Sequence, residues 1–388
     1  MNRCVHYLCN LSREADEFEL CQFPAATTKC KYILDVVKKL PNVSKVNLLS
    51  VAQTKSRKWK IVFASKFQYD DKEQDFRMLS VGSPLKIIRA VNMPILFFSI
   101  LWYLLRNVNK DDVVIVYHSC AYLTAVRLAQ KIRKINLILE MEEIYADVTG
   151  ETKLREKELS FSKLADAFIF PTQLLDETVN SNYRNAIVIH GTYEIEKIKC
   201  EKVWDDNKVH VVYAGTLDPR KGGAAAAAKA AKFLPKNYHI HILGFGSKEQ
   251  VENIQNVIRQ NTDEKSATVS YDGLLSGEKY ICFLQNCDIG LSTQDPTAAF
   301  NKTSFPSKIL SYMANGLRVV SVNIEAVKKS TVGDLITYYN RQAPEEIANA
   351  IKNVDMSVPY DSRQRLIELN QKFQNEMEKL IEDISHEF

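Results

Sequence analysis

The sequence has no strong excess of either charge sign, and this absence argues against one broad class of partner. Its 51 Lys and Arg residues nearly balance 47 Asp and Glu residues, which leaves a formal net charge of +4. The chain has no dense run of basic residues, whereas nucleic-acid binding requires a clustered basic patch. The charge pattern therefore predicts that nucleic acid is not a partner.

Closely spaced cysteine pairs are also lacking. The eight cysteines lie at positions 4, 9, 21, 30, 120, 200, 282 and 287, and none belongs to a CxxC pair. Scattered cysteines in a chain of this length are typical of free thiols in a reducing cytosol, which is the state that we expect here.

The chain begins without a recognisable secretory signal. Residues 1–19 turn acidic after only a few apolar residues, which is unlike a signal peptide. We therefore expect the protein to remain in the cytoplasm.

A hydrophobic run long enough to span a membrane is lacking as well. The longest apolar stretch is 93–105, which is shorter than the roughly twenty residues of a spanning helix. It is flanked by Lys86, Arg89, Arg106 and Lys110. One interpretation is a core helix that precedes a buried strand. The other is that its aromatic and basic residues lie on the anionic inner face of a membrane.

What the chain does contain is a regular alternation of apolar strands and helical segments. The expected strands are residues 4–9, 45–52, 58–65, 112–119, 136–141, 167–172, 186–190, 209–216, 238–246, 268–273, 288–293 and 318–323. Helical patterns lie between most of them, which is typical of parallel sheets covered on both faces. The pattern predicts an α/β fold with two Rossmann-like halves.

A polar connection at 191–208 separates two strand-helix series. We therefore predict a first domain over 1–195 and a second over 196–360. Residues 361–388 contain a long amphipathic pattern, predicted to be a helix that packs on the first domain.

Residues 303–323 are the most informative segment. Thr303 and Ser304 are candidate N-caps, Pro306 suits the first helical turn, and Gly316 suits a helix end. The start of such a helix attracts phosphate, and Ser307 and Lys308 would lie in its first turn.

Three further strand ends carry residues suited to an anionic ligand. They are residues 215–223, with Arg220 and Lys221, the glycine turn 244–247, and residues 271–274. In open parallel sheets, ligands bind beyond the carboxyl ends of the strands. Together these turns predict a nucleoside diphosphate site.

These motifs, in this order, resemble the C-terminal domain of family 4 glycosyltransferases of the GT-B fold. The resemblance covers residues 209 to about 355 and includes GTLDPRKG at 215–222, DIGLST at 288–293 and FPSKILSYMANGLRVVS at 305–321. It implies two Rossmann-like domains that face each other across a cleft. The second would bind a nucleoside-diphosphate sugar and the first a glycan or lipid-linked acceptor. The capsule and lipopolysaccharide branch is similar in its FPSK motif, which implies surface polysaccharide biosynthesis.

The resemblance also implies a set of site residues. Lys221 would contact the donor diphosphate, with Ser307 and Lys308 at the sugar-phosphate end. Neither a metal nor a cofactor is expected, because helix ends and cations would stabilise the leaving group. Two glutamates common in the family are replaced by Thr303 and Ser311. The full predicted donor set is Gly215, Thr216, Arg220, Lys221, Gly244, Gly246, Asp272, Gly273, Leu274, Thr303, Ser304, Phe305, Pro306, Ser307, Lys308 and Ser311.

In the first half, three residues are candidate catalytic groups. His118 ends the strand 112–119, and relatives sometimes have a histidine there that approaches the reacting sugar; the alternative is a packed or strand-capping histidine. Glu142 and Glu143 follow the strand 136–141, where a carboxylate could accept a proton from an acceptor hydroxyl. The alternative is a solvated start to the next helix.

The family resemblance implies transfer with retention of the anomeric configuration. One alternative is an inverting transferase of the same fold that uses Glu142 or Glu143 as its base. Another is a sugar-nucleotide-binding subunit that is catalytically impaired.

Overall fold

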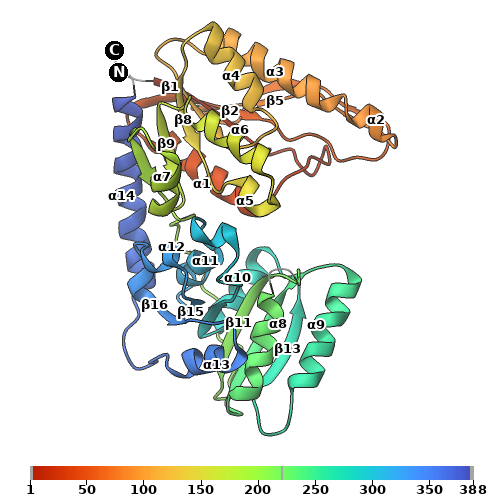
Figure 1. The fold of residues 1–388 in the computed structure, drawn as a ribbon, viewed down its shortest axis with the longest axis vertical. Helices are drawn as coiled ribbons and strands as arrows, with labels where there is room; N and C mark the ends of the chain where they lie inside the picture. The colour runs from red at the N-terminus through yellow and green to blue at the C-terminus, as the bar shows by residue number, and fades with distance from the viewer. Residues whose placement is uncertain (1–2, 220–221, 385–388) are drawn as a thin grey trace. The chain divides into compact units, whose positions relative to one another are not determined.

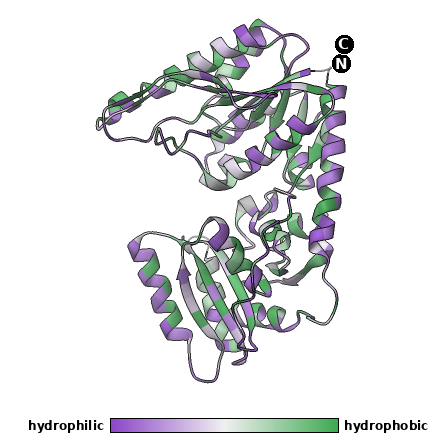
Figure 2. Ribbon diagram, turned by 180° about the vertical axis from the view of Figure 1, so that it is seen from behind, coloured by the Kyte–Doolittle hydropathy of each residue, from purple (hydrophilic) through white to green (hydrophobic). Residues whose placement is uncertain are grey.

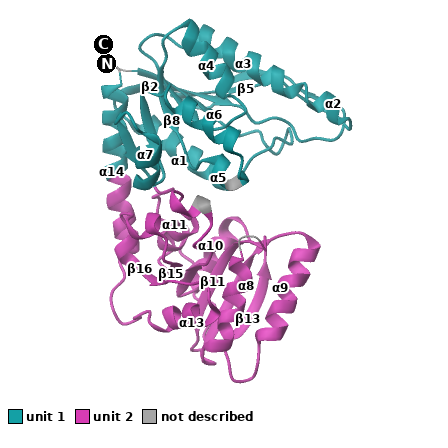
Figure 3. Ribbon diagram, in the orientation of Figure 1, with its two compact units in different colours: residues 1–189, 372–388 teal, residues 190–371 magenta. Residues whose placement is uncertain are grey.

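The computed structural model describes residues 3–219 and 222–384, except for the side chains of residues 24, 148, 299 and 300. These residues form two compact units (Figure 3). Unit 1 combines the chain up to Ile189 with residues from Lys372 onward, and unit 2 runs from His190 to Gln371. The boundary between the two units therefore comes directly after the last strand of unit 1. It lies six residues before the predicted domain boundary.

Unit 1 is built on a sheet of eight strands, counted over its described residues, in the order β10-β9-β8-β7-β1-β2-β5-β4 (Figure 1). Its neighbours pair in parallel except for β4 and β5. The bounds are β1 Arg3–Cys9, β2 Val43–Ser50, β4 Ser65–Gln68, β5 Glu73–Arg77, β7 Val113–Tyr117, β8 Asn136–Glu140, β9 Ala167–Phe170 and β10 Ala186–Val188. The carboxyl ends of β7 and β8 carry the candidate catalytic residues.

The helices of unit 1 are α1 Pro24–Lys39, α2 Lys86–Arg89, α3 Asn92–Asn107, α4 Leu123–Ile132, α5 Tyr145–Thr149, α6 Thr152–Ser162 and α7 Gln173–Val179. One hydrophobic cluster joins α3, α4, α6 and α7 to β7, β8 and β9. The end of α14, Ser362–Asp383, also belongs to this unit, where Phe373 stacks on Tyr32 of α1. The first ten residues of α14 belong to unit 2, whereas the whole of 361–388 was predicted to pack on the first domain.

The prediction of a strand at 58–65 was wrong in its bounds and its pairing. Residues Lys60–Val62 form β3, which pairs antiparallel with β6, Ser80–Gly82, and β4 begins at Ser65. The parallel neighbour of β2 is instead β5, whose sequence EQDFR has no apolar run. Its buried Glu73 is paired with Arg13 and Lys38, and these ion pairs make burial of the strand tolerable.

Unit 2 is built on a sheet of six strands, counted over its described residues, in the order β13-β12-β11-β14-β15-β16 (Figure 1). Its neighbours all pair in parallel. The strands are β11 Val209–Thr216, β12 Tyr238–Phe245, β13 Thr268–Gly273, β14 Ile289–Ser292, β15 Arg318–Val322 and β16 Ile336–Tyr339. The α/β fold with parallel sheets in two Rossmann-like halves is thus confirmed.

The α-helices of unit 2 are α8 Gly223–Ala230, α9 Lys248–Asn261, α10 Gly277–Asn286, α11 Lys308–Ala314, α12 Glu325–Lys328 and α13 Pro344–Lys352. Short 3-10 turns occupy η1 Ala231–Phe233, η2 Ala299–Lys302 and η3 Gly333–Leu335. Helix α8 packs against both α9 and α13. The carboxyl ends of the six strands therefore lead into these helices and loops at one edge of the sheet.

The helix predicted to open at Pro306 begins two residues later. Helix α11 starts at Lys308, with Ser307 at the N-cap position and no side-chain cap. Thr303 and Ser304 therefore do not cap it, because the intervening chain is not helical. At the other end the prediction was right: Gly316 has φ +86°, and Leu317 N–H donates to the carbonyl of Tyr312, which makes a Schellman motif.

The expectation of free thiols was wrong for two cysteines. Cys200 and Cys282 form a disulfide, with their Cα atoms 5.2 Å apart. The segment that contains Cys200 lies against α10, where Cys200 N–H donates to Gln285 Oε1 at 3.0 Å. This pairing joins positions 82 residues apart, so the cysteine spacing gave no sign of it.

The apolar segment of unit 1 has both a buried and an exposed face. Helix α3 buries Leu96, Ile100 and Leu104, but Phe98 and Trp102 are each 65% exposed. The stretch 86–107 contains an 18-residue window with a mean hydropathy of 1.7 and is long enough to cross a membrane by length and composition alone. Only 28% of that window is buried, so it is not simply a core helix. Figure 2 shows green residues along α2 and α3, with purple and pale ones between them.

Candidate functional site

The carboxyl ends of β11 and β12 lie so close together that they need glycine. Gly215 pairs with Gly244 in the parallel register. A Cβ atom on Gly244 would overlap the carbonyl oxygen of Gly215, and Gly244 has φ +158°. The two strand ends thus approach each other at the ligand-binding edge of the sheet with no side chain between them.

Lys308 brings a cation to this edge. Its Nζ lies 4.1 Å from the ring centroid of Tyr213, and a Cβ on Gly215 would lie 3.1 Å from the same Nζ. Burial raises the pKa of Tyr213 to about 12, so its hydroxyl keeps its proton at neutral pH. The side chain of Lys308 thereby brings the start of α11 and the end of β11 together.

The start of α8 adds a helix N-terminus to the same edge. Its N-cap, Gly222, has φ +63° and offers no side chain. Gly223 packs so tightly that a Cβ there would lie 2.5 Å from the carbonyl oxygen of Thr293 and 2.8 Å from Tyr213. Arg220 and Lys221, predicted to bind the diphosphate, lie outside the described residues. The first turn of α8 therefore has backbone N–H groups without a side-chain cap.

Gln342, a residue that sequence reasoning missed, also lies at the start of α8. Its Nε2 would be 3.5 Å from a Cβ on Gly222, and this buried atom has no hydrogen-bond partner among the described residues. Gln342 lies in the loop after β16, and nothing in the sequence around it resembles a binding motif. A buried amide donor without a partner indicates a place for a ligand atom.

The predicted donor residues in and near the loops after β12 and β13 have different surroundings. Gly246 is followed by α9, whose N-terminus is closed by its own capping box between Ser247 and Gln250. Leu274 is 65% exposed and Phe245, which the prediction did not include, is 55% exposed. Asp272 instead contacts Ser270 and His241, as described below. The end of β12 and the loop after β13 thus each carry an exposed apolar side chain.

Residues 303–311 are placed mostly by packing. Thr303 is buried, and Phe305 stacks on His190 with ring centroids 4.8 Å apart. Burial raises the pKa of Tyr280 on α10, and a hydrogen bond with Ser311 opposes that shift. Ser311 is thus engaged with a neighbouring helix, whereas Ser307 at the N-cap of α11 is exposed.

In unit 1, His118 is a buried histidine with unusual surroundings. It is 1% exposed and stacks on Tyr145, and neither ring nitrogen has a hydrogen-bond partner among the described residues. Its Nε2 lies 3.6 Å from Glu158 Oε1. Burial lowers the pKa of His118 to about 4, so the ring is neutral at pH 7.

The carboxylates after β8 lie in unlike environments. Glu142 is paired with the buried Lys29. Glu140, the last residue of β8, accepts a hydrogen bond from Tyr7, and burial together with the charge of Glu142 raises its pKa to about 8. Glu143 has further interactions of its own and is half-buried.

Comparisons with known proteins identify a domain and a fold. Residues 208–354 match the family model for group 1 glycosyl transferases. The whole chain is similar in fold to trehalose-6-phosphate synthase from E. coli bound with UDP-2-fluoro glucose, at 11% identity and a TM-score of 0.69, with 100% of both chains covered. The comparison with the sucrose-phosphate synthase from Thermosynechococcus elongatus gives 12% identity and a TM-score of 0.71, with 99% of both covered. A search of curated protein sequences finds no match.

A third similar structure is an alpha,alpha-trehalose-phosphate synthase from Burkholderia xenovorans in complex with glucose-6-phosphate, at 10% identity and a TM-score of 0.64, with 98% of this chain and 100% of that chain covered. At these identities the structural likeness shows the fold, whereas the family model identifies the domain of unit 2. Residues 208–354 thus form a group 1 glycosyl transferase domain, within a chain that has the GT-B fold.

Proposed function

We propose that the protein transfers a sugar from a nucleoside-diphosphate donor to a glycan or lipid-linked saccharide acceptor in surface polysaccharide biosynthesis. The observation that carries the proposal is the convergence of Lys308, the bare strand ends at Gly215 and Gly244, and the uncapped start of α8. A cation and a helix N-terminus at one strand edge suit a diphosphate. The neighbouring structures carry UDP-2-fluoro glucose and glucose-6-phosphate, which agrees with a nucleotide-sugar donor and a sugar acceptor.

In this proposal the departing diphosphate is stabilised by protein groups. Lys308 and the N–H groups of α8 supply positive charge where the leaving group gains negative charge. Gln342 Nε2 donates to an oxygen of the donor. The sugar is transferred with retention of configuration and without a metal at this site, and the leaving phosphate accepts the proton of the acceptor hydroxyl.

A thermal-shift screen of nucleoside diphosphates and their sugars tests the donor half of the proposal. A ligand present at a hundred times its dissociation constant stabilises the folded state by about 2.7 kcal/mol. We expect one base and one sugar to raise the melting temperature most. If no member of the panel raises it, the proposed donor site is wrong.

We further propose that the cytoplasmic protein contacts the inner face of the membrane through unit 1. Large apolar side chains are exposed on and just before β3 and on α2 and α3: Trp59, Ile61, Ile87, Phe98 and Trp102. Lys58, Lys66 and Lys86 are exposed among them. Exposed aromatic groups with basic neighbours bind anionic lipid surfaces, and such a position would bring the protein to a lipid-linked acceptor.

Flotation with anionic lipid vesicles tests this contact. The double variant Phe98→Ser and Trp102→Ser should lose vesicle binding, because it removes two exposed aromatic groups. Tyr183→Ser is the matched control, since Tyr183 is 94% exposed elsewhere on unit 1. Equal binding of the double variant and the control would refute the proposed surface.

A further inference from the structure

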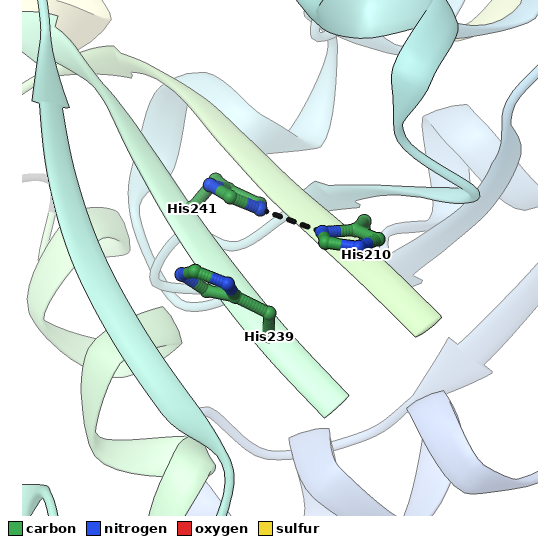
Figure 4. A group of neighbouring side chains, drawn as sticks. All are labelled: His210, His239 and His241. Atoms are coloured by element: carbon green, nitrogen blue, oxygen red, sulfur yellow. Dashed lines mark hydrogen bonds between the residues drawn. The ribbon is translucent and has the colours of Figure 1, made fainter. Parts of the chain in front are cut away.

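Three histidines meet on the sheet of unit 2. His210 lies on β11, and His239 and His241 lie on β12 (Figure 4). One ring nitrogen from each lies within 4.8 Å of the other two. His210 and His241 are each 3% exposed, whereas His239 is half-buried. The cluster is therefore enclosed but open on the side of His239.

The hydrogen bonds around the cluster fix which nitrogens carry protons. His210 Nε2 lies 3.0 Å from Asp206 Oδ1, and His241 Nδ1 lies 3.2 Å from Asp272 Oδ2. An ionised carboxylate only accepts hydrogen bonds, so each of these nitrogens is the N–H donor. The nitrogens left over are His210 Nδ1 and His241 Nε2, which carry lone pairs in the neutral rings.

These two lone pairs face each other. His210 Nδ1 and His241 Nε2 are 2.9 Å apart (Figure 4). Two neutral acceptors at this distance repel, unless a cation or an additional proton lies between them. The same reasoning applies to the ring of His239. The hydroxyl of Ser270 donates its proton to Asp272 at 2.8 Å, so the hydroxyl oxygen of Ser270 accepts a hydrogen bond from His239 Nε2 at 3.0 Å. His239 is then left with a lone pair on Nδ1.

We propose that His210, His239 and His241 bind a divalent transition-metal ion of the Zn²⁺ type. Imidazole nitrogen is a preferred ligand of Zn²⁺, at about 2.0–2.1 Å. Tetrahedral geometry at that bond length separates ligand nitrogens by about 3.3 Å. The nitrogens of His210 and His241 are 2.9 Å apart, and the ring of His239, stacked on that of His241 with centroids 3.9 Å apart, would turn to bring its nitrogen to the ion. Asp206 and Asp272 hold the distal ring nitrogens, as the second shell of metal-binding histidines does.

The surroundings of the cluster favour a fixed ion. Trp204 stacks on His210 and His241, with ring centroids 4.2 and 4.7 Å away. The segment that carries Trp204 is anchored to α10 by the Cys200–Cys282 disulfide and by Val203 N–H, which donates to Asn286 Oδ1 at 2.6 Å. The ion would thus join β11 and β12 beneath this segment.

The cluster is separate from the proposed donor site. His210 is the second residue of β11 and Gly215 the seventh, so they lie about 16 Å apart along the strand. Alternate residues of a strand face opposite sides of the sheet, and His210 therefore faces the side opposite Tyr213, the ring beneath Lys308. We therefore assign the ion a structural role in unit 2 and no part in glycosyl transfer.

Cobalt titration of the tag-free, metal-stripped protein tests the proposal. We expect one Co²⁺ per chain, with visible absorption bands of a four-coordinate ion, and displacement of Co²⁺ by one equivalent of Zn²⁺. His239→Gln should abolish the bands. Asp206→Asn should weaken Co²⁺ affinity by about 10- to 100-fold, because it removes only the second-shell carboxylate. Asp206 is exposed, so this variant should fold normally.

A control variant and the contacts of a second group of ligand atoms bear on the specificity of the result. His190→Gln removes a buried histidine of unit 2 outside the cluster and should leave the bands unchanged. A second group, Cys4, His6 and Asp112, also brings ligand atoms together, but both ring nitrogens of His6 already contact Tyr103 and Asp112. Absence of the Co²⁺ absorption bands in the parent protein, or bands that survive in His239→Gln, would overturn the proposal. A proton shared between His210 Nδ1 and His241 Nε2 would then explain their 2.9 Å separation.

Discussion

Replacement of Lys308 by alanine should weaken binding of the nucleotide-sugar donor. The structure places its Nζ 3.1 Å from the position of a Cβ on Gly215, at the end of β11 where the diphosphate is proposed to lie. Loss of a hydrogen bond to a charged group costs about 1.5–3 kcal/mol. The dissociation constant should therefore rise by about 10- to 150-fold.

The same substitution should have a smaller effect on stability. The contact between Lys308 and the ring of Tyr213 is a cation–π interaction, which contributes about 0.5–2 kcal/mol. Urea unfolding should detect that loss and show that the variant is folded under the conditions of the binding assay.

Calorimetry with the donor identified by the thermal-shift screen is the assay. Lys352→Ala is the matched control, because Lys352 is an exposed lysine at the end of α13 in the same unit. It should bind the donor as the parent protein does. If Lys308→Ala also binds with an affinity within twofold of the parent, the cation is not at the diphosphate and the reasoning fails.

Three further predictions concern pH and packing. The pKa of His118 is lowered to about 4 in the folded protein, so the unfolded chain binds the additional proton between about pH 6.5 and 4 and stability falls as the pH falls through that window. His118 contributes about 3 kcal/mol at most to the free energy of unfolding through this effect. Urea unfolding at pH 7 and 5 should therefore show a smaller loss of stability in His118→Phe than in the parent protein, and an equal loss would refute this prediction. The pKa of Glu140 is raised to about 8, so the folded protein holds a proton that the unfolded chain releases above about pH 4.5, and stability falls as the pH rises towards 8. Glu140→Gln should remove this loss in unfolding measured from pH 6 to 9, and a parallel decline would contradict the assignment. Gly290→Ala should destabilise unit 2 by about 1–3 kcal/mol, because the new Cβ would overlap the ring of Tyr312. Gly273→Ala meets no atom within 4 Å and has only the strain of φ +79°, so thermal unfolding should show the smaller loss there, and the reverse order would contradict the packing.

The sequence was sufficient for the architecture because its strands are apolar and its helices are periodic. It was insufficient where tertiary contacts override local pattern. Strand β5 is charged, and its pairing with β2 depends on Arg13 and Lys38, which lie far away in the sequence. Helix α11 begins at Lys308 although Pro306 is a good first-turn residue, so local preference misplaced the start.

The geometry of the candidate donor site was partly predictable for a similar reason. Gly215, Gly244 and Lys308 were found because they follow strands or begin a helix, and the sheet brings such positions to one edge. Gln342 could not be found, because its place beside Gly222 depends on the pairing of β15 with β16 and on the loop that follows. The histidine cluster depends in the same way on the register of β11 and β12.

Glycosyl transfer itself is the most direct test of the central claim. The purified protein should be incubated with the donor selected by the screen and with lipid-linked saccharide acceptors, and the product should be analysed by NMR. The proposal predicts a new glycosidic bond with the anomeric configuration of the donor. An inverted product would contradict retention and favour Glu142 or Glu143 as a base. Donor binding with neither transfer nor hydrolysis for any acceptor would contradict the proposed reaction.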